Sequence, residues 1–291
     1  MPILDALLNG LTLGGMYALI AIGLTLQYGV ARIMNLSYGQ LLVAAAFAAW
    51  WLFGNFSISP IAALVLVAPA SFVLHWLVYR ILLVPLVRRA RNRDMLEVDS
   101  ILATFGLLFV VEGLLLVFFG GNYVNYSYLD RVFMVLGTPL AADRLLALGF
   151  ALAIGLVLYL LLHRTRPGTA LRAVAVSTLA AQLVAIDVRA VAAFAFALGG
   201  ALVAASGVLV SMFLTFNAVM GVVFTMKALI VVIMGGVGNL LGALVAGLIL
   251  GLTESFVATF VAPGLTLAAT FALFLIVLVL RPAGLFGRAT T

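Results

Sequence analysis

Three ionisable residues stand inside long apolar runs of this chain, and they are the first candidates for chemistry. They are Glu112, Lys227 and Glu254, and Lys227 is the only lysine in the sequence. A charged side chain is costly at membrane depth, and where one occurs it is a functional candidate for a substrate, ion or proton pathway. The competing interpretation is structural: Lys227 pairs with a carboxylate or extends toward the interface, and Glu254 lies near a helix end. The sequence leaves both interpretations open.

A second candidate is the polar segment Asn35-Leu36-Ser37-Tyr38-Gly39-Gln40, which interrupts an apolar stretch. Such a density of polar side chains around a glycine does not suit a lipid-facing helix. The segment predicts a helix start or break that faces a polar cavity, with Asn35, Ser37 and Gln40 as path or gate residues. An N-cap role for Asn35 or Ser37 explains the same residues equally well.

The third candidate is a glycine-rich break between two apolar runs, Gly235-Gly236-Val237-Gly238-Asn239-Leu240-Leu241-Gly242. Irregular backbone at membrane depth is tolerated only where it is buried in protein or lines a watery cavity. We therefore expect a gate or a stretch of translocation path at Gly235, Gly236, Gly238 and Gly242.

The first apolar run carries small residues on one helical face. Gly10 and Gly14 lie four residues apart, and Gly15 widens the same surface. Close packing of two helices accounts for this spacing. Tyr17, which follows these glycines, is a further candidate for the path or gate.

Several kinds of chemistry lack their sequence signatures. The chain has no G-x-x-x-x-G-K-[ST] nucleotide loop, no H-E-x-x-H metal pattern, no G-x-S-x-G nucleophile motif and no cysteine. We therefore expect no catalytic residue, no metal, no cofactor and no ATP hydrolysis on this chain.

The composition predicts an integral membrane protein. The 291 residues are 66% hydrophobic and 8% charged, with a mean hydropathy of +1.34, whereas a soluble domain carries about 25% charged residues. The net charge of +6 comes from arginines clustered between apolar runs. This distribution follows the positive-inside rule for membrane proteins. It therefore indicates contact with membrane lipid and not with nucleic acid.

The apolar runs predict an all-α, polytopic fold with about nine transmembrane helices, in a range of about eight to ten, because each needs roughly 20 apolar residues. The first run lacks a basic start and a cleavage motif, so we expect it to be retained. Residues 1–291 are expected to form a single transmembrane domain with broken or re-entrant glycine-rich segments. The predicted spans are 5–29, 34–53, 59–83, 97–119, 143–162, 190–213, 219–235, 240–260 and 265–281.

The sidedness follows from the arginines. The loop 84–96 holds Arg88, Arg89, Arg91 and Arg93, and the loop 163–189 is also basic, so both are predicted to be cytoplasmic. The C-terminal tail, with Arg281 and Arg288, has no acidic residue and joins them. The tyrosine-rich segment 120–142 and the N-terminus are predicted to lie outside. Span 219–235 can either cross the membrane or re-enter.

The segment 164–189 has a helical pattern of apolar residues after Pro167-Gly168, with alanines that keep it slim. A short amphipathic helix of this kind can lie on the membrane surface or dock into a groove on a soluble partner. The residues of interest are Arg166, Gly168, Arg172, Leu179, Leu183 and Ala185.

Taken together, these motifs resemble the permease subunits of bacterial ABC importers for branched-chain amino acids, in particular the LivH-type permease. The resemblance rests on the Asn9 to Thr25 region, the Arg164 to Ala175 region, Met234 to Ala243, and the closing Arg281-Pro282-Ala283-Gly284-Leu285-Phe286-Gly287. It implies half of a translocation path in the bacterial inner membrane. It also implies four partners: a LivM-type second permease, two cytoplasmic ATPase subunits and a periplasmic substrate-binding protein. The segment 164–189 would then be the element that couples to an ATPase.

The chain departs from the family pattern at Tyr38 and Gln40, where members commonly have a histidine and an acid, and at Val176-Ser177 and Ala185. The resemblance implies branched-chain or other hydrophobic amino acids as cargo. Because of these departures, urea, amides or small organic acids stay as alternatives within the same family. A stand-alone secondary transporter is the alternative of another class. It would need ion-coordinating acids in several spans, and only Glu112 and Glu254 are available.

Overall fold

The computed structural model describes residues 2–89, 93–126, 128–129, 131–135 and 138–287, so that Arg91 and Arg288 lie outside the described residues. Helices dominate it, which confirms the predicted all-α class. The helices are α1 (Pro2–Ala31), α2 (Tyr38–Phe56), α3 (Pro60–Val78), α4 (Val84–Arg89), α5 (Arg93–Phe119), α6 (Ala142–Arg164), α7 (Arg166–Val176), α8 (Thr178–Leu183), α9 (Val188–Ser211), α10 (Gly221–Gly235), α11 (Leu240–Phe260) and α12 (Thr266–Leu280).

The number of membrane-crossing helices agrees with the prediction. Among the described residues, eight helical stretches are long and apolar enough to cross a membrane, and the apolar α10, with 15 residues, is shorter. The chain is therefore a multi-pass membrane protein. This helix corresponds to the predicted span 219–235, and its crossing of the membrane stays a prediction.

Helices extend into the predicted loop 84–96 from both sides, since α5 already begins at Arg93. The predicted loop 84–96 is helical as far as Arg89, because α3 continues through a π-helical turn, Tyr79–Leu83, into α4. The turn ends with Val84 donating to the carbonyl of Tyr79. Pro85 has no N–H to donate, and the wider turn before it accommodates the ring without ending the helix.

Small residues hold α1 against α11 along most of their length. A side chain on Gly14 would collide with the backbone of Leu248, and one on Gly251 would collide with the backbone of Gly14. Ser255 donates to the carbonyl of Ala6 at 2.7 Å, which closes the same contact near the N-terminus. The predicted glycine face of the first span is therefore a helix-packing surface.

The start of α2 lies inside the bundle. The hydroxyl of Tyr38, the first residue of α2, donates to the carbonyls of Ile20, at 3.0 Å, and Gly199, at 3.2 Å. These two residues lie in the middle of α1 and α9, so the chain turns back into the bundle after α1 ends. The polar segment 35–40 therefore lies in the interior of the helix bundle.

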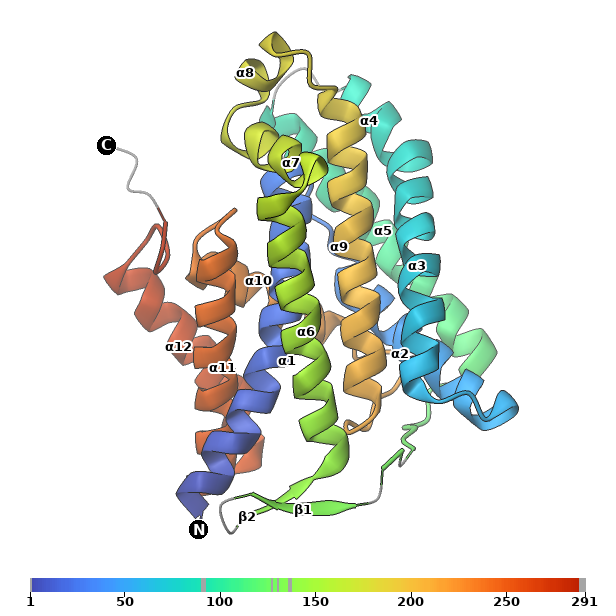
Figure 1. Ribbon diagram of the computed structural model, residues 1–291, viewed down its shortest axis with the longest axis vertical. Helices are drawn as coiled ribbons and strands as arrows, with labels where there is room; N and C mark the ends of the chain where they lie inside the picture. Colours follow the sequence, from blue (N-terminus) through green and yellow to red (C-terminus); the bar gives the residue numbers. More distant parts are fainter. Residues whose placement is uncertain (1, 90–92, 127, 130, 136–137, 288–291) are drawn as a thin grey trace.

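The two ends of the bundle differ in character (Figure 1). The end with the N-terminus carries an antiparallel hairpin, β1 (Val132–Val135) and β2 (Thr138–Ala141), which the sequence did not predict. The opposite end carries the arginine-bearing α4 together with α7 and α8. This separation agrees with the predicted sidedness, which stays a prediction.

Candidate translocation site

A polar network joins the segment before α2 to the core of α1. Asn35 donates from Nδ2 to Oε1 of Gln27 at 3.1 Å, and Gln27 donates to the carbonyl of Phe196 in α9 at 2.9 Å. The Oδ1 atom of Asn35 accepts two hydrogen bonds from Ser37, one from its hydroxyl at 2.6 Å and one from its backbone N–H at 3.1 Å. The buried side chains of Gln27, Asn35 and Ser37 are thus hydrogen-bonded to one another away from water. Asn35 and Ser37 were predicted as site residues, and Gln27 was not.

In this network neither Asn35 nor Ser37 caps α2 through its side chain. Ser37 occupies the N-cap position of α2, yet its side chain caps no backbone N–H of the helix. Instead Asn35 closes the turn before the helix, and its amide reaches α1. Both residues are almost completely buried in this chain, at 1% and 0% exposure. The segment is therefore a buried polar break within the bundle.

Gln40 lies where the first residues of α2 meet the first residues of α10. Its Nε2 donates to the carbonyl of Ala218, whereas its Oε1 is buried without a hydrogen-bond donor. Beside it, the N–H of Gly39 donates to the hydroxyl of Thr225 at 2.9 Å. Side chains on Gly39 or Gly221 would overlap the facing helix, so only glycine allows the two helix starts to approach this closely.

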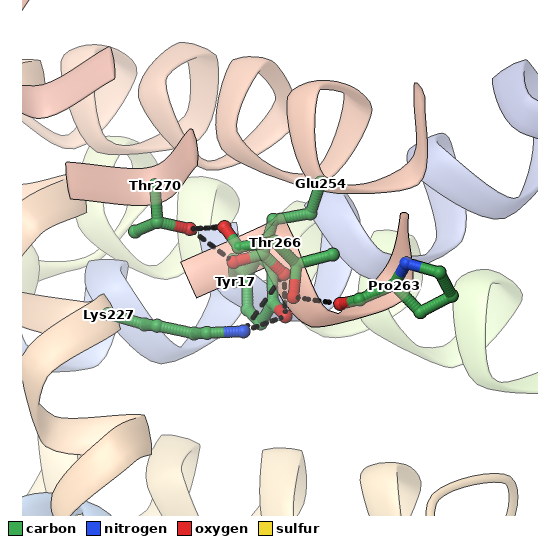
Figure 2. Close-up of polar contacts among 6 residues, drawn as sticks. All are labelled: Tyr17, Lys227, Glu254, Pro263, Thr266 and Thr270. Atoms are coloured by element: carbon green, nitrogen blue, oxygen red, sulfur yellow. Dashed lines mark hydrogen bonds and ion pairs between the residues drawn. The ribbon is translucent and has the colours of Figure 1, made fainter. Parts of the chain in front are cut away.

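Two of the three intramembrane ionisable residues form one cluster with Tyr17 (Figure 2). Nζ of Lys227 lies 2.9 Å from Oε2 of Glu254 and donates to the Tyr17 hydroxyl at 2.8 Å. That hydroxyl donates to the same Glu254 oxygen at 2.7 Å, and Thr270 donates to the other carboxylate oxygen at 2.6 Å. The four side chains come from α1, α10, α11 and α12, so this cluster connects four helices.

The cluster shows why the charges are tolerated. Glu254 is 5% exposed and Lys227 16% exposed, so both are largely removed from solvent. Both carboxylate oxygens accept hydrogen bonds, and Lys227 also lies over the Tyr17 ring, 4.8 Å from its centre. A buried pair of this kind is tolerable because charge and hydrogen bonds are satisfied together. The alternative that Lys227 pairs with a carboxylate is confirmed.

Glu112 does not join this cluster. It lies on α5, a helix that is mostly exposed on the outside of the bundle, and no hydrogen bond or ion pair involves it within the described residues. The sequence placed Glu112 beside Lys227 and Glu254 as an equal candidate, but the fold separates it from them.

The glycine-rich break lies at the far end of α1 from the N-terminus, where Gly238 approaches Gly29. Gly236 and Gly238 have φ values of +98° and +81°, which other residues rarely adopt. The C-terminal segment packs against this break: Leu285 donates to the carbonyl of Met234 at 2.7 Å, and Phe286 to that of Gly235 at 3.2 Å.

The glycines of this break lie close to one another or to neighbouring backbone. Gly235 and Gly242 lie against each other at the ends of α10 and α11, and a side chain on either would collide with the other's backbone. Asn239 caps α11 by accepting from the N–H of Gly242 and donates to the carbonyl of Phe286. The four predicted glycines therefore share one turn, which is separate from both the Asn35 network and the Lys227 cluster.

The predicted coupling segment forms α7 and α8 rather than one continuous helix. Thr165 caps α7 by accepting from the N–H of Gly168, and Gly168 packs against the end of α6, where a side chain would collide with Leu161 and Leu162. Ser177 interrupts the helix and caps α8 by accepting from the N–H of Ala180. Ala185 ends the segment with φ +59°.

The outward face of this segment is apolar. Leu179 is 70% exposed and Leu183 81% exposed, together with Val176 and Val184, whereas Leu171 is buried. Arg166 and Arg172 are exposed nearby. The break at Ser177 leaves Leu179 and Leu183 exposed, and their predicted role in coupling to a partner stays a prediction.

Sequence reasoning missed several residues that complete these clusters. Gln27 is a polar residue inside an apolar run, so the cost of burying an amide could have identified it. Thr225 and Thr270 carry no such signal, because a threonine in an apolar helix usually bonds back to its own turn. In the described part of the chain, no group of His, Cys, Asp and Glu side chains could hold a metal ion.

Comparisons with known proteins agree with this arrangement. A family model described as "Branched-chain amino acid transport system / permease component" matches residues 6–280. The high-affinity branched-chain amino acid transport system permease protein LivH of Escherichia coli (strain K12) is 27% identical, over 98% of this chain and 96% of that protein. BraD of Pseudomonas aeruginosa, a protein with the same description, is 30% identical with the same coverage. No solved structure matches the chain.

A more distant relative extends the range of organisms. The probable branched-chain amino acid transport permease protein LivH of Methanocaldococcus jannaschii is 26% identical over 78% of this chain and 72% of that protein. The family match covers the Asn35 network, the Lys227 cluster, the glycine turn and α7–α8. These relatives are described as permease components of transport systems, so the chain is a transport subunit and no enzyme. It belongs to the family of branched-chain amino acid transport system permease components.

Proposed function

We propose that this chain forms half of the translocation path of an ABC importer for branched-chain or other hydrophobic amino acids. The observation that carries the proposal is the buried polar break at Asn35–Gln40, which a purely structural helix bundle does not need. The named substrates of the relatives support the choice of cargo.

Within this proposal, Asn35, Ser37 and Gln40 belong to the gate rather than to an open passage, because all three are closed off from solvent in this structure. Tyr17 contributes through the Lys227 cluster. The glycines from Gly235 to Gly242 act at the other end of α10. A gate of this kind has two conformations, and its partners bias it toward one of them.

The proposal assigns four partners: a second, LivM-type permease, two cytoplasmic ATPase subunits and a periplasmic substrate-binding protein. The exposed leucines of α8 and the exposed Arg166 and Arg172 support α7–α8 as the surface that meets an ATPase, since apolar residues exposed at a bundle end are typical of an interaction site. The proposed location is the bacterial inner membrane, with α7 and α8 in the cytoplasm.

The proposal is tested by purifying the tagged chain from gently solubilised native membranes and identifying the proteins that accompany it. We expect a second permease and P-loop ATPases. The purified assembly is then reconstituted into liposomes with its binding protein, and ATP-dependent uptake of radiolabelled leucine is compared with uptake of urea and acetamide. A chain that purifies alone and carries cargo without ATP would contradict the proposal.

A further inference from the structure

An open hollow lined by basic side chains lies on the α3–α4 helix. Figure 1 shows that α4 lies at the end of the bundle that carries α7 and α8. The volume of the hollow is about 360 Å³, and it is lined by Arg80, Val84, Pro85, Arg88 and Arg89. Most of this helix is unburied, so the hollow faces the surroundings of the bundle and not its core.

The π-helical turn creates the hollow. In an uninterrupted α-helix, residues eight apart, such as Arg80 and Arg88, diverge by a large angle around the axis. The wider turn at Tyr79–Leu83 inserts one extra residue and brings these two side chains to one side. Pro85 lines the same hollow and adds no N–H that would compete for an anion.

The three arginines give this hollow a positive charge. Within the described part of the chain, no acidic side chain pairs with Arg80, Arg88 or Arg89. All three guanidinium groups are exposed. Guanidinium groups placed side by side repel one another, and an anion that bridges them removes this repulsion.

The neighbouring side chains locate the hollow at the boundary of the lipid. The Arg80 guanidinium lies over the Trp76 ring, 5.0 Å from its centre, and tryptophan is enriched at headgroup level. Ile81 is 71% exposed and Leu77 40% exposed on the same helix. An apolar surface that continues into a basic hollow matches a molecule with acyl chains and an anionic head.

We propose that this hollow binds the phosphate headgroup of an anionic phospholipid. Arginine forms paired hydrogen bonds with phosphate oxygens, and basic pockets between or beside membrane helices are suited to such headgroups. The binding site is independent of the proposed transport function, because it rests on the α3–α4 helix and not on the gate.

The full chain in phosphatidylcholine nanodiscs, titrated with phosphatidylglycerol and followed by native mass spectrometry, tests the assignment. We expect R88Q to weaken phosphatidylglycerol binding about fivefold and the variant R80Q/R88Q/R89Q about a hundredfold. The matched control is R164Q, which removes an exposed arginine at the same end of the bundle but outside the hollow. Thermal unfolding in phosphatidylcholine alone verifies that each variant is folded.

Three outcomes would overturn the assignment. Equal loss of binding in R88Q and R164Q would mean that the total charge attracts the lipid and that the hollow does not. Displacement of the lipid by millimolar inorganic phosphate would identify a free-phosphate site instead. A triple variant that keeps its lipid but loses its ATPase partners would identify the hollow as a protein contact.

Discussion

The carboxylate of Glu254 has donors from three other helices, and this explains how a bundle with so few charges keeps one in its interior. Tyr17 and Thr270 satisfy its oxygens, and Lys227 balances its charge. The ion pair of Lys227 and Glu254 therefore connects α10 to α11, and its hydrogen bonds extend to α1 and α12. A change in one partner leaves the other charged and unpaired.

Single substitutions in this pair should destabilise the protein strongly. We expect Lys227→Met to lower the free energy of unfolding by about 3–5 kcal/mol, because it leaves a buried carboxylate without its counter-charge. The double variant Lys227→Met/Glu254→Gln should recover much of this loss. The measurement is a double-mutant cycle by chemical denaturation in detergent.

Glu112→Gln is the matched control for this cycle, since Glu112 has no partner among the described residues. It should change stability by less than about 0.5 kcal/mol. Losses that simply add in the double variant would show that Lys227 and Glu254 do not act as a pair.

At the scale of elements, the bundle depends on the close contact between α1 and α11. Hydrophobic burial does not drive helices together in lipid, so van der Waals contact and hydrogen bonds between backbones that approach closely must do so. The glycines of both helices make this approach possible, and Ser255 adds a hydrogen bond.

A bulky residue in this contact should separate the two helices. We expect Gly251→Leu to cost at least about 3 kcal/mol, because the side chain would occupy the space of the Gly14 backbone. Gly106→Leu in α5 is the control: no other group lies near that position, so stability should stay within about 1 kcal/mol. Size-exclusion profiles and melting temperatures in detergent measure both. Equal behaviour of the two variants would contradict the packing role.

The turn between α10 and α11 is an element of a different kind, because its backbone is strained for any residue but glycine. Gly236→Val should reduce amino-acid uptake at least tenfold while ATPase partners still co-purify, since the new side chain is incompatible with φ +98° and with the C-terminal segment. Gly264→Val, at a position with open space and an ordinary φ, should leave uptake within about twofold. Normal uptake by Gly236→Val would refute a role of this turn in the gate.

At the scale of the whole molecule, the two ends of the bundle present different surfaces. One end carries the β1–β2 hairpin, and the other carries α7, α8 and the basic α4 (Figure 1). The leucines of α8 are exposed and lie outside the core of this chain, so we expect them to contribute to an interaction with another molecule.

Leu179→Ser/Leu183→Ser should therefore weaken ATPase capture at least tenfold and leave the melting temperature of the isolated chain within about 2 °C. The expected effect on capture follows from the loss of two apolar contacts in a desolvated interface. Met134→Ser, which removes an exposed apolar side chain at the opposite end, is the control. Quantitative co-purification of the ATPase subunits measures both, and equal capture by the two variants would exclude α8 from the contact.

The sequence by itself determined the class of the fold, the family and most of the helix positions. These follow from run length and composition, because a membrane span must be long, apolar and internally hydrogen-bonded. The pattern also identified Asn35, Ser37, Gln40, Lys227 and Glu254 as unusual, since polar groups in an apolar run are costly wherever the run folds.

Only the tertiary structure decided which of these residues belong together. Tyr17 and Glu254 are far apart in the chain, and their contact depends on α1 and α11 packing side by side. The same fold separates Glu112 from Lys227, and it places the glycine turn beside the C-terminal segment. Periodicity reports which face of a helix is apolar, but not which helix lies against it. The partner of each polar group is therefore set by packing between distant segments, which the local sequence does not encode.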